Sequence, residues 1–273
     1  MAADTECGFR LEQLNELPAF LFNSWALQAG LVHAILTRQG GVSRPPYATL
    51  NLGDAVGDDP AAVAANHERV YRALGIVRTQ AVKCHLVHGS DIRVATAQDG
   101  GQWLGKADGM ITGQPGVFLS MRFADCMPIL LNDARRSAVG LVHAGWRGTL
   151  QNVAGAAVRA MVERLGCAAG DITAVIGPSI GPCCYEVESD VISAVEAAFE
   201  NSAALLHRRN SRRATFDLWQ ANRQHLLAAG VGRVVNPELC TACEAHHFFS
   251  HRREAGRTGR FGVVIGYRDA KAC

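Results

Sequence analysis

The clearest pattern in the chain is a pair of apolar runs on either side of a short polar segment. Pro128–Leu131 and Ala138–Val142 are apolar, and Ala134–Ser137 between them is polar. Two such runs joined by a polar turn are typical of a β-hairpin. If the turn closes there, Cys126 before the first run and His143 after the second lie at the open end of the hairpin. The pattern therefore predicts that a thiolate and an imidazole face one point in space.

The rest of the chain alternates between further apolar runs and helical patterns. Asp59, Pro60 and Gly75 predict the cap, first turn and exit of a helix. Helical spacing also predicts helices over residues 149–165, 189–200 and 217–229, and short apolar runs predict strands over 31–37, 81–87, 117–122, 172–176, 232–235 and 261–267.

These elements predict an α+β fold, with mixed β-sheets and flanking helices, because strands and helices alternate without a strict βαβ rhythm. We expect residues 1–30 to be a loosely ordered segment that leads into an edge element. Residues 31–273 are expected to form a single catalytic domain, since no linker or internal repeat divides them.

The composition narrows the possible partners. Hydrophobic residues make up 48% of the chain and charged residues 19%, which permits a large packed core. A formal net charge of +2 is too small for a general nucleic-acid or membrane-surface protein. No secretory signal or membrane span is visible, so we expect a cytoplasmic protein whose nine cysteines are thiols, ligands or core residues.

His88, Cys126 and His143 are the first candidate site. Each stands where an apolar run meets small residues, in LVHGS, FADCMP and LVHAGWRG. Two imidazoles and a thiolate are a good ligand set for Zn²⁺, and a fourth position left to water would make the site catalytic. Buried polar residues bonded to the backbone would explain the same positions, and spacing alone does not separate the two interpretations.

Charged residues near these motifs are the second set of candidates. Arg147 and Arg38 could bind phosphate or stabilise developing charge, or Arg147 could form a structural ion pair with Asp125 or Asp133. Asp125 could orient His143 or act as a base, or it could be a turn residue; Asp108 allows the same interpretations with weaker support.

Two groups of cysteines remain. Cys240 and Cys243 have CxxC spacing, with His246, His247 and His251 nearby, and such a set can bind zinc or act in redox exchange. The chain has no second CxxC, however, which weakens both interpretations. We interpret these cysteines as structural thiols, and the adjacent Cys183 and Cys184 as ordinary turn or core residues.

Several motifs together resemble one known family. They are LTRQGGVSRPPYATLNLGDAVGDDPAAVAAN, HLVHGS, ADCMPILL, GLVHAGWRGT, IGPSIGPCCYEV, FDLWQANR and FFSHRREAGRTGR, in that order between about Leu31 and Ile265. This set is similar to the laccase-domain family, also called YfiH-type, whose members were named multicopper polyphenol oxidases. The resemblance implies a zinc-type site at the positions that are His88, Cys126 and His143 here.

The resemblance also implies an activity. It is phosphorolysis of purine nucleosides (adenosine, inosine and S-methyl-5'-thioadenosine), with adenosine deamination as a side activity. The expected partners are a small nucleoside and phosphate, and the chain is expected to be a monomer or homodimer. Some members of the family instead edit peptidoglycan precursors.

Three other functions stay open from the residues. Cys126 could be the nucleophile of a hydrolase without metal, with His143 or His88 as its base. A single copper could bind at the same residues beside Met127, but a multicopper oxidase needs His-X-His pairs, and the ten histidines of this chain form none. The same pocket could also serve a non-catalytic binding protein.

Overall fold

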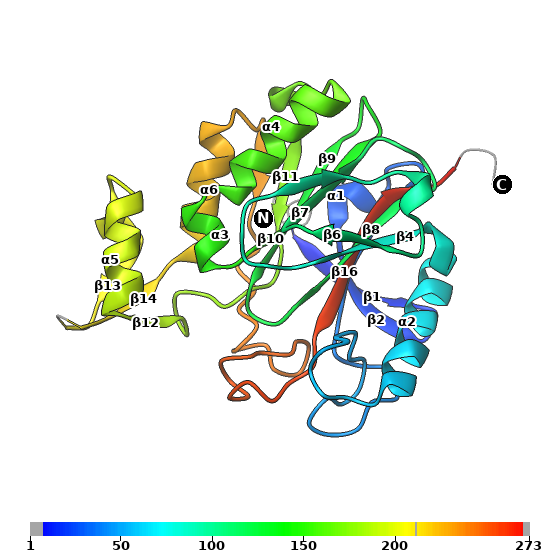
Figure 1. The fold of residues 1–273 in the computed structure, drawn as a ribbon, viewed down its shortest axis with the longest axis horizontal. Helices are drawn as coiled ribbons and strands as arrows, with labels where there is room; N and C mark the ends of the chain where they lie inside the picture. Colours follow the sequence, from blue (N-terminus) through cyan, green and yellow to red (C-terminus); the bar gives the residue numbers. More distant parts are fainter. Residues whose placement is uncertain (1–7, 211, 270–273) are drawn as a thin grey trace, which may run out of the picture.

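The computed structural model describes residues 8–210 and 212–269 of the 273-residue chain. Two mixed β-sheets face each other across the centre of the molecule, and helices cover their outer faces (Figure 1). A smaller sheet with helix α5 (Ser189–Ala198) projects from one side. This four-layer arrangement confirms the predicted α+β class with mixed sheets and flanking helices.

The first central sheet has seven strands, and its order begins with a hairpin at one edge. In spatial order its strands are β1 (Phe9–Leu14), β2 (Leu17–Phe22), β3 (Leu31–Leu36), β16 (Phe261–Tyr267), β8 (Phe118–Phe123), β4 (Ala81–His85) and β6 (Trp103–Lys106).

The N-terminal hairpin corrects one expectation. We expected residues 1–30 to be loosely ordered, but β1 and β2 pair antiparallel along their full length, and the short helix α1 (Asn23–Ala26) follows. Leu17, Ala19 and Leu21 alternate into the core beneath β2, so this segment gains its order from burial that its weak local pattern does not show. Residues 1–7 lie outside the described residues.

The second central sheet has six strands and contains the predicted hairpin. Its strands, in spatial order, are β15 (Arg233–Val235), β11 (Thr173–Ile176), β9 (Met127–Asp133), β10 (Ala138–Ala144), β7 (Gly109–Thr112) and β5 (Ile92–Val94). β9 and β10 pair antiparallel with His143 opposite Pro128, which confirms the hairpin and places His143 at its open end.

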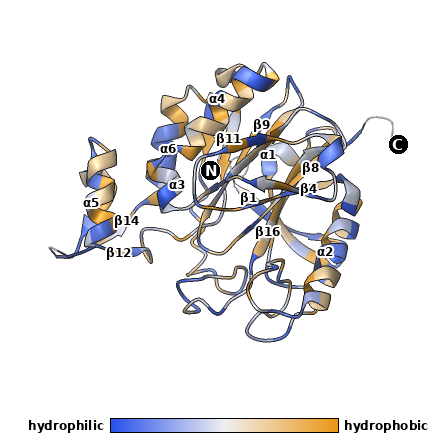
Figure 2. Cartoon of the chain, viewed as in Figure 1, coloured by the Kyte–Doolittle hydropathy of each residue, from blue (hydrophilic) through white to orange (hydrophobic). Residues whose placement is uncertain are grey.

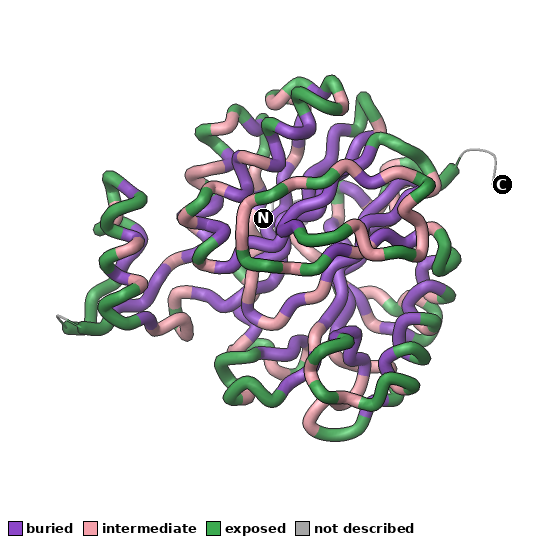
Figure 3. The backbone as a smooth tube through the Cα atoms, in the orientation of Figure 1, coloured by how far each residue is buried: buried purple, intermediate pink, exposed green. Residues whose placement is uncertain are grey.

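Both faces of this hairpin are buried. Ile129 and Leu131 pack toward the helices, whereas Leu130 and Leu141 pack toward the other sheet. A strand covered on both faces needs apolar residues at every position, which explains the continuous apolar runs in the sequence. Apolar residues line the central strands in Figure 2, and Figure 3 shows burial concentrated there.

The helices begin and end largely where their caps predict. Asp59 accepts the Ala61 N–H at the start of α2 (Pro60–Leu74), and Gly75 ends that helix in the left-handed conformation, as expected. The helix predicted over residues 149–165 is two helices, because Asn152 turns left-handed and caps the second. The helices on the six-stranded sheet are α3 (Trp146–Leu150), α4 (Val153–Leu165) and α6 (Leu218–Ala228).

Smaller elements complete the described part of the chain. The projecting sheet contains β12 (Glu186–Glu188), β14 (Arg213–Phe216) and β13 (Leu206–Arg208), and single 3-10 turns occupy Arg78–Gln80, Ala97–Asp99, Ala169–Asp171 and Ser202–Ala204. Of the helices in the described residues, none has the length and apolar character that crossing a membrane requires.

Candidate active site

His88, Cys126 and His143 come together at one end of the two central sheets. His88 follows β4, Cys126 lies between β8 and β9, and His143 is near the end of β10. One nitrogen of each histidine and the cysteine sulfur lie within 4.8 Å of one another. The two imidazole rings are nearly perpendicular, with centroids 5.0 Å apart. The structure therefore contains the convergence that the hairpin pattern predicts.

A buried carboxylate ties the two histidines to each other. Asp108 Oδ1 lies 2.9 Å from His143 Nδ1, and the same oxygen accepts the backbone N–H of His88 at 2.9 Å. The second oxygen accepts the N–H groups of Val87 and Gly89, at 3.2 and 2.7 Å. His88 is held at φ +59°, an uncommon conformation for a residue with a side chain, and these bonds fix it there.

Asp108 is thus the residue that orients the imidazole, and Asp125 is not. Asp125 Oδ1 accepts the Thr241 hydroxyl at 2.6 Å, and Oδ2 accepts the backbone N–H of Arg252 at 2.6 Å. Asp125 therefore fastens two distant loops beside Cys126, and of the roles considered for it, the orientation of His143 is wrong. Only the fold could show this exchange of roles, because Asp108 is 35 residues from His143 along the chain.

The electrostatics of the site favour a thiolate beside a charged imidazole. Burial alone would raise the pKa of the Cys126 thiol, but the positive charge of His143 and hydrogen bonds from both histidines outweigh it and lower the pKa to about 6. Burial would lower the pKa of His143, but the Cys126 thiolate and the Asp108 carboxylate raise that pKa to about 9. The pKa of Asp108 is lowered, since its hydrogen bonds from His143 and Gly89 outweigh burial.

Gly145 leaves the room that the three side chains need. A Cβ at this position would lie 3.1 Å from Cys126 Sγ and 3.1 Å from His88 Cδ2. The backbone there is extended, with φ −77°, so the requirement for glycine comes from this close approach rather than from its conformation.

The three residues open onto a pocket of about 770 Å³. Its walls include the aromatic side chains of Trp103, Trp146 and Tyr185, and the guanidinium groups of Arg147, Arg252 and Arg260. A pocket of this volume, with flat apolar walls and a few convergent polar groups, fits a small organic ligand. Sequence analysis missed Arg252 and Arg260 as pocket residues, although both belong to the motif FFSHRREAGRTGR.

Arg147 is an exposed cation in the pocket wall. Its guanidinium stacks over the Trp146 ring, 4.2 Å from the centroid. Within residues 8–210 and 212–269, no carboxylate forms an ion pair with it. The structural ion pair with Asp125 or Asp133 that we considered is therefore not formed, and the guanidinium fork is available to an anion.

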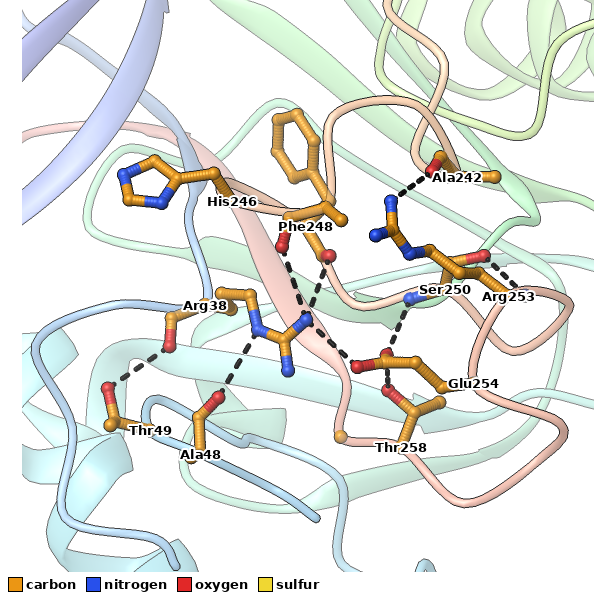
Figure 4. A network of polar contacts seen from close by, with 12 residues as sticks. Arg38, Ala48, Thr49, Ala242, His246, Phe248, Ser250, Arg253, Glu254 and Thr258 are labelled. Atoms are coloured by element: carbon orange, nitrogen blue, oxygen red, sulfur yellow. Dashed lines mark hydrogen bonds and ion pairs between the residues drawn. The ribbon is translucent and has the colours of Figure 1, made fainter. Parts of the chain in front are cut away.

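Arg38 has a structural position instead, which corrects its assignment as a substrate-binding residue. It does not line the pocket. Its guanidinium donates to Glu254 at 2.9 Å and to the carbonyl oxygens of Ala48, Ala245 and Phe248, as Figure 4 shows. These bonds join the first glycine-rich loop to the segment before β16.

The donor set fits Zn²⁺ better than copper of the blue type. Two imidazoles and one thiolate are ligands that zinc prefers. The carboxylate of Asp108 holds the other ring nitrogen of His143, as a carboxylate often does for a histidine that binds zinc. The axial methionine of a blue-copper centre is not supplied, because Met127 packs in the core between β9 and the helices.

Known proteins share this fold. A family model described as "Multi-copper polyphenol oxidoreductase laccase" matches residues 32–268. The crystal structure of YlmD from Geobacillus stearothermophilus superimposes with a TM-score of 0.89 at 38% identity, covering 96% of this chain and 99% of that one. That of YfiH from Bacillus licheniformis also gives 0.89, at 34% identity.

Two named relatives are similar to this chain over most of its length. "Purine nucleoside phosphorylase YlmD" of Geobacillus stearothermophilus is 41% identical over 251 residues, which cover 88% of this chain and 92% of the relative. "Purine nucleoside phosphorylase" of Deinococcus radiodurans is 42% identical over 234 residues, 86% and 88% of the two chains. The protein is an α+β chain of the YlmD and YfiH type. It belongs to the laccase-domain family, also called YfiH-type.

Proposed function

We propose that this protein is a zinc-dependent purine nucleoside phosphorylase. Its substrates are adenosine, inosine and S-methyl-5'-thioadenosine, with adenosine deamination as a side activity. The observation that carries the proposal is the meeting of His88, Cys126 and His143 within 4.8 Å, on the wall of a pocket of about 770 Å³. Relatives that are 41% and 42% identical to this chain are named purine nucleoside phosphorylases, which supports the phosphorylase part of the proposal.

The pocket walls suit a nucleoside. A purine is a flat aromatic ring that the aromatic side chains of Trp146 and Tyr185 can contact. Trp103 also lines the pocket, but its ring already stacks on His85, with centroids 4.2 Å apart. The volume lies within the usual range for small-ligand sites, roughly 300–1,000 Å³.

The cationic groups suit phosphate. The guanidinium of Arg147 is free of ion pairs among the described residues and presents a planar donor fork. Arg252 and Arg260 face the same pocket, so the positive charge around it favours a dianion next to the sugar.

The reaction replaces one bond by another. An oxygen of hydrogen phosphate forms a bond to C1' of the ribose, and the bond from C1' to the purine nitrogen breaks. The proton that hydrogen phosphate gives up goes to the departing base. Zn²⁺ held by His88, Cys126 and His143 would supply a Lewis acid beside the reacting groups. Asp108 holds the imidazole of His143 in orientation, and Arg147 positions phosphate and stabilises the charge that develops on it.

The proposal is tested by incubating the purified protein with inosine or adenosine and phosphate, and separating the products by chromatography. We expect free base and ribose 1-phosphate in equal amounts, and none without phosphate or after Cys126→Ala. A zinc-loaded protein that releases no base from any of the three nucleosides would contradict the proposal.

One further observation favours a second candidate, a cysteine hydrolase acting on amides such as peptidoglycan precursors. Cys126, His143 and Asp108 form a line of thiolate, imidazole and carboxylate, which is the arrangement of a cysteine nucleophile with its base and orienting group. This candidate predicts that a chelator leaves activity intact while a thiol alkylator abolishes it, whereas the zinc enzyme loses activity with the chelator.

Oxidation of polyphenols by several coppers has less support. Among the described residues, two groups of side chains could hold a metal, one with two histidines and a cysteine and one with cysteines alone. A multicopper oxidase needs additional histidine clusters, and the described part of the chain does not contain them.

A further inference from the structure

A second group of possible metal ligands, made of four cysteines, lies outside the pocket. Cys183 and Cys184 follow β11, and Cys240 and Cys243 follow β15. Their four Sγ atoms all lie within 4.8 Å of one another. Nothing in the sequence connects the two pairs, since Cys183 and Cys243 are 60 residues apart and only folding brings them together.

Backbone hydrogen bonds hold the two loops side by side at this point. β11 and β15 are parallel neighbours, so the loops that follow them leave the sheet at the same edge. Ser179 then joins the loops, because its N–H donates to Leu239 O at 3.1 Å and its carbonyl accepts the Thr241 N–H at 3.0 Å. These two bonds flank Cys240 and hold its loop beside the loop that carries Cys183 and Cys184.

We propose that Cys183, Cys184, Cys240 and Cys243 bind one Zn²⁺ as a structural site, separate from the pocket site. Four thiolates about 2.3 Å from one ion in a tetrahedron lie roughly 3.8 Å apart. Cys183 Sγ is 3.7 Å from Cys243 Sγ, and Cys184 Sγ is 3.5 Å from it. A disulfide would hold its sulfurs at about 2.05 Å, so the spacing matches a shared ion and not a covalent bond.

The surroundings of Cys240 support the same conclusion. Its sulfur accepts the backbone N–H of Gly181 at 3.3 Å. Donors aimed at a sulfur stabilise the thiolate that a metal requires. Arg253 donates to the carbonyl of Ala242 at 2.9 Å, which brings a positive charge close to a centre whose net charge would be negative.

A closed set of four protein ligands indicates a structural role, because no position remains for water or substrate. The two loops carry parts of the pocket wall. Ile180 and Tyr185 line the pocket from the first loop, and Thr241 in the second donates to Asp125 beside Cys126. The ion would thus stabilise the wall of the pocket without taking part in the reaction.

The direct test is the zinc content of protein purified under reducing conditions without chelator, measured by native mass spectrometry and elemental analysis. We expect about two zinc ions per chain in the wild type, one in Cys126→Ala, one in Cys243→Ser and none in the double variant. Cys167→Ala changes a buried thiol outside both clusters and should keep two. One zinc in the wild type, unchanged by Cys243→Ser, would overturn the proposal.

X-ray absorption at the zinc edge on Cys126→Ala keeps the test decisive even if Cys243→Ser fails to fold. This variant leaves the four-cysteine cluster intact, so we expect a shell of sulfur alone at roughly 2.3 Å. Nitrogen in that shell, iron in place of zinc, or a disulfide among the four cysteines in peptide mapping would each contradict the proposal. None of these results depends on whether the protein cleaves nucleosides.

Discussion

The carboxylate of Asp108 lies 2.9 Å from His143 Nδ1, and the same carboxylate accepts three backbone N–H groups from the turn that carries His88. A single buried side chain therefore sets the orientation of one proposed ligand and the backbone conformation of another. The geometry of the pocket site depends on this carboxylate as much as on the ligands themselves.

Asp108→Asn should weaken the site while leaving the protein folded. The amide has one acceptor oxygen where the carboxylate has two, and it does not hold the charged imidazole. We expect zinc affinity and kcat/KM to fall by roughly 10- to 100-fold. Competition with a chromophoric chelator measures the affinity, and circular dichroism checks the fold. Unchanged zinc affinity in a folded variant would show that Asp108 does not support the site.

Gly145→Ala should damage the site through crowding. The added methyl group would lie 3.1 Å from both Cys126 Sγ and His88 Cδ2, so one of them must move. We expect kcat/KM to fall by roughly 10- to 100-fold with little change in Tm, since small displacements of reacting groups are costly. Gly170→Ala is the matched control, because a Cβ there meets no atom of the described residues within 4 Å. Equal activity in the two variants would argue against the crowding.

Arg147→Ala should impair phosphate use without loss of stability. The guanidinium is exposed and lies over the Trp146 ring, and a charge-assisted contact to phosphate is worth about 1.5–3 kcal/mol. We therefore expect the KM for phosphate to rise by about 10- to 100-fold. Steady-state kinetics with varied phosphate measure it, and an unchanged phosphate KM would remove Arg147 from that role.

Arg38→Ala should lower the stability of the protein and leave the KM for phosphate unchanged. This guanidinium binds Glu254 and three backbone carbonyls, so its removal leaves a partly buried carboxylate and carbonyl groups without a partner (Figure 4). We expect a loss on the order of 3 kcal/mol in the free energy of unfolding. Chemical denaturation measures it. A stable variant with a raised phosphate KM would restore Arg38 as a substrate-binding residue.

Acid should destabilise the protein through His33. Burial lowers the pKa of His33 from 6.5 to about 4, and the neutral ring accepts the Phe22 N–H at 2.8 Å. The unfolded chain therefore takes up a proton below pH 6.5 that the folded chain does not, and stability is lost as the pH falls from 6.5 toward 4. We expect this residue to cost about 2 kcal/mol at pH 5 relative to pH 8.

His33→Gln provides the control for that prediction. The glutamine carbonyl can accept the same N–H but does not titrate. The difference in unfolding free energy between wild type and variant, measured with urea at several pH values, should shrink or reverse toward pH 5. A difference that is constant with pH would contradict the assignment.

Local patterns predicted the parts of the fold that depend on neighbours in sequence. The apolar runs at residues 128–131 and 138–142 became β9 and β10, and Asp59 and Gly75 bound α2 as expected. The N-terminal hairpin was missed because its order comes from Leu17 and Ala19, which pack against residues distant in the sequence.

In the site, too, contacts within one hairpin could be predicted, and contacts between distant segments could not. Cys126 and His143 could be predicted because one hairpin brings them together. The sequence supports Asp108 less strongly than Asp125 as the partner of His143, and only the fold decides which of the two carboxylates reaches it. Local patterns could not predict the four-cysteine cluster for the same reason, since its halves lie on loops that come together through the pairing of β11 with β15 and the bonds of Ser179.

The most direct test of the central claim is base release from inosine and phosphate, measured as zinc is added back to metal-free protein. The account predicts no release before addition, and a rate that rises with zinc occupancy in the wild type and stays absent in His143→Ala. Full phosphorolysis by the metal-free wild type, or by folded His143→Ala, would contradict it.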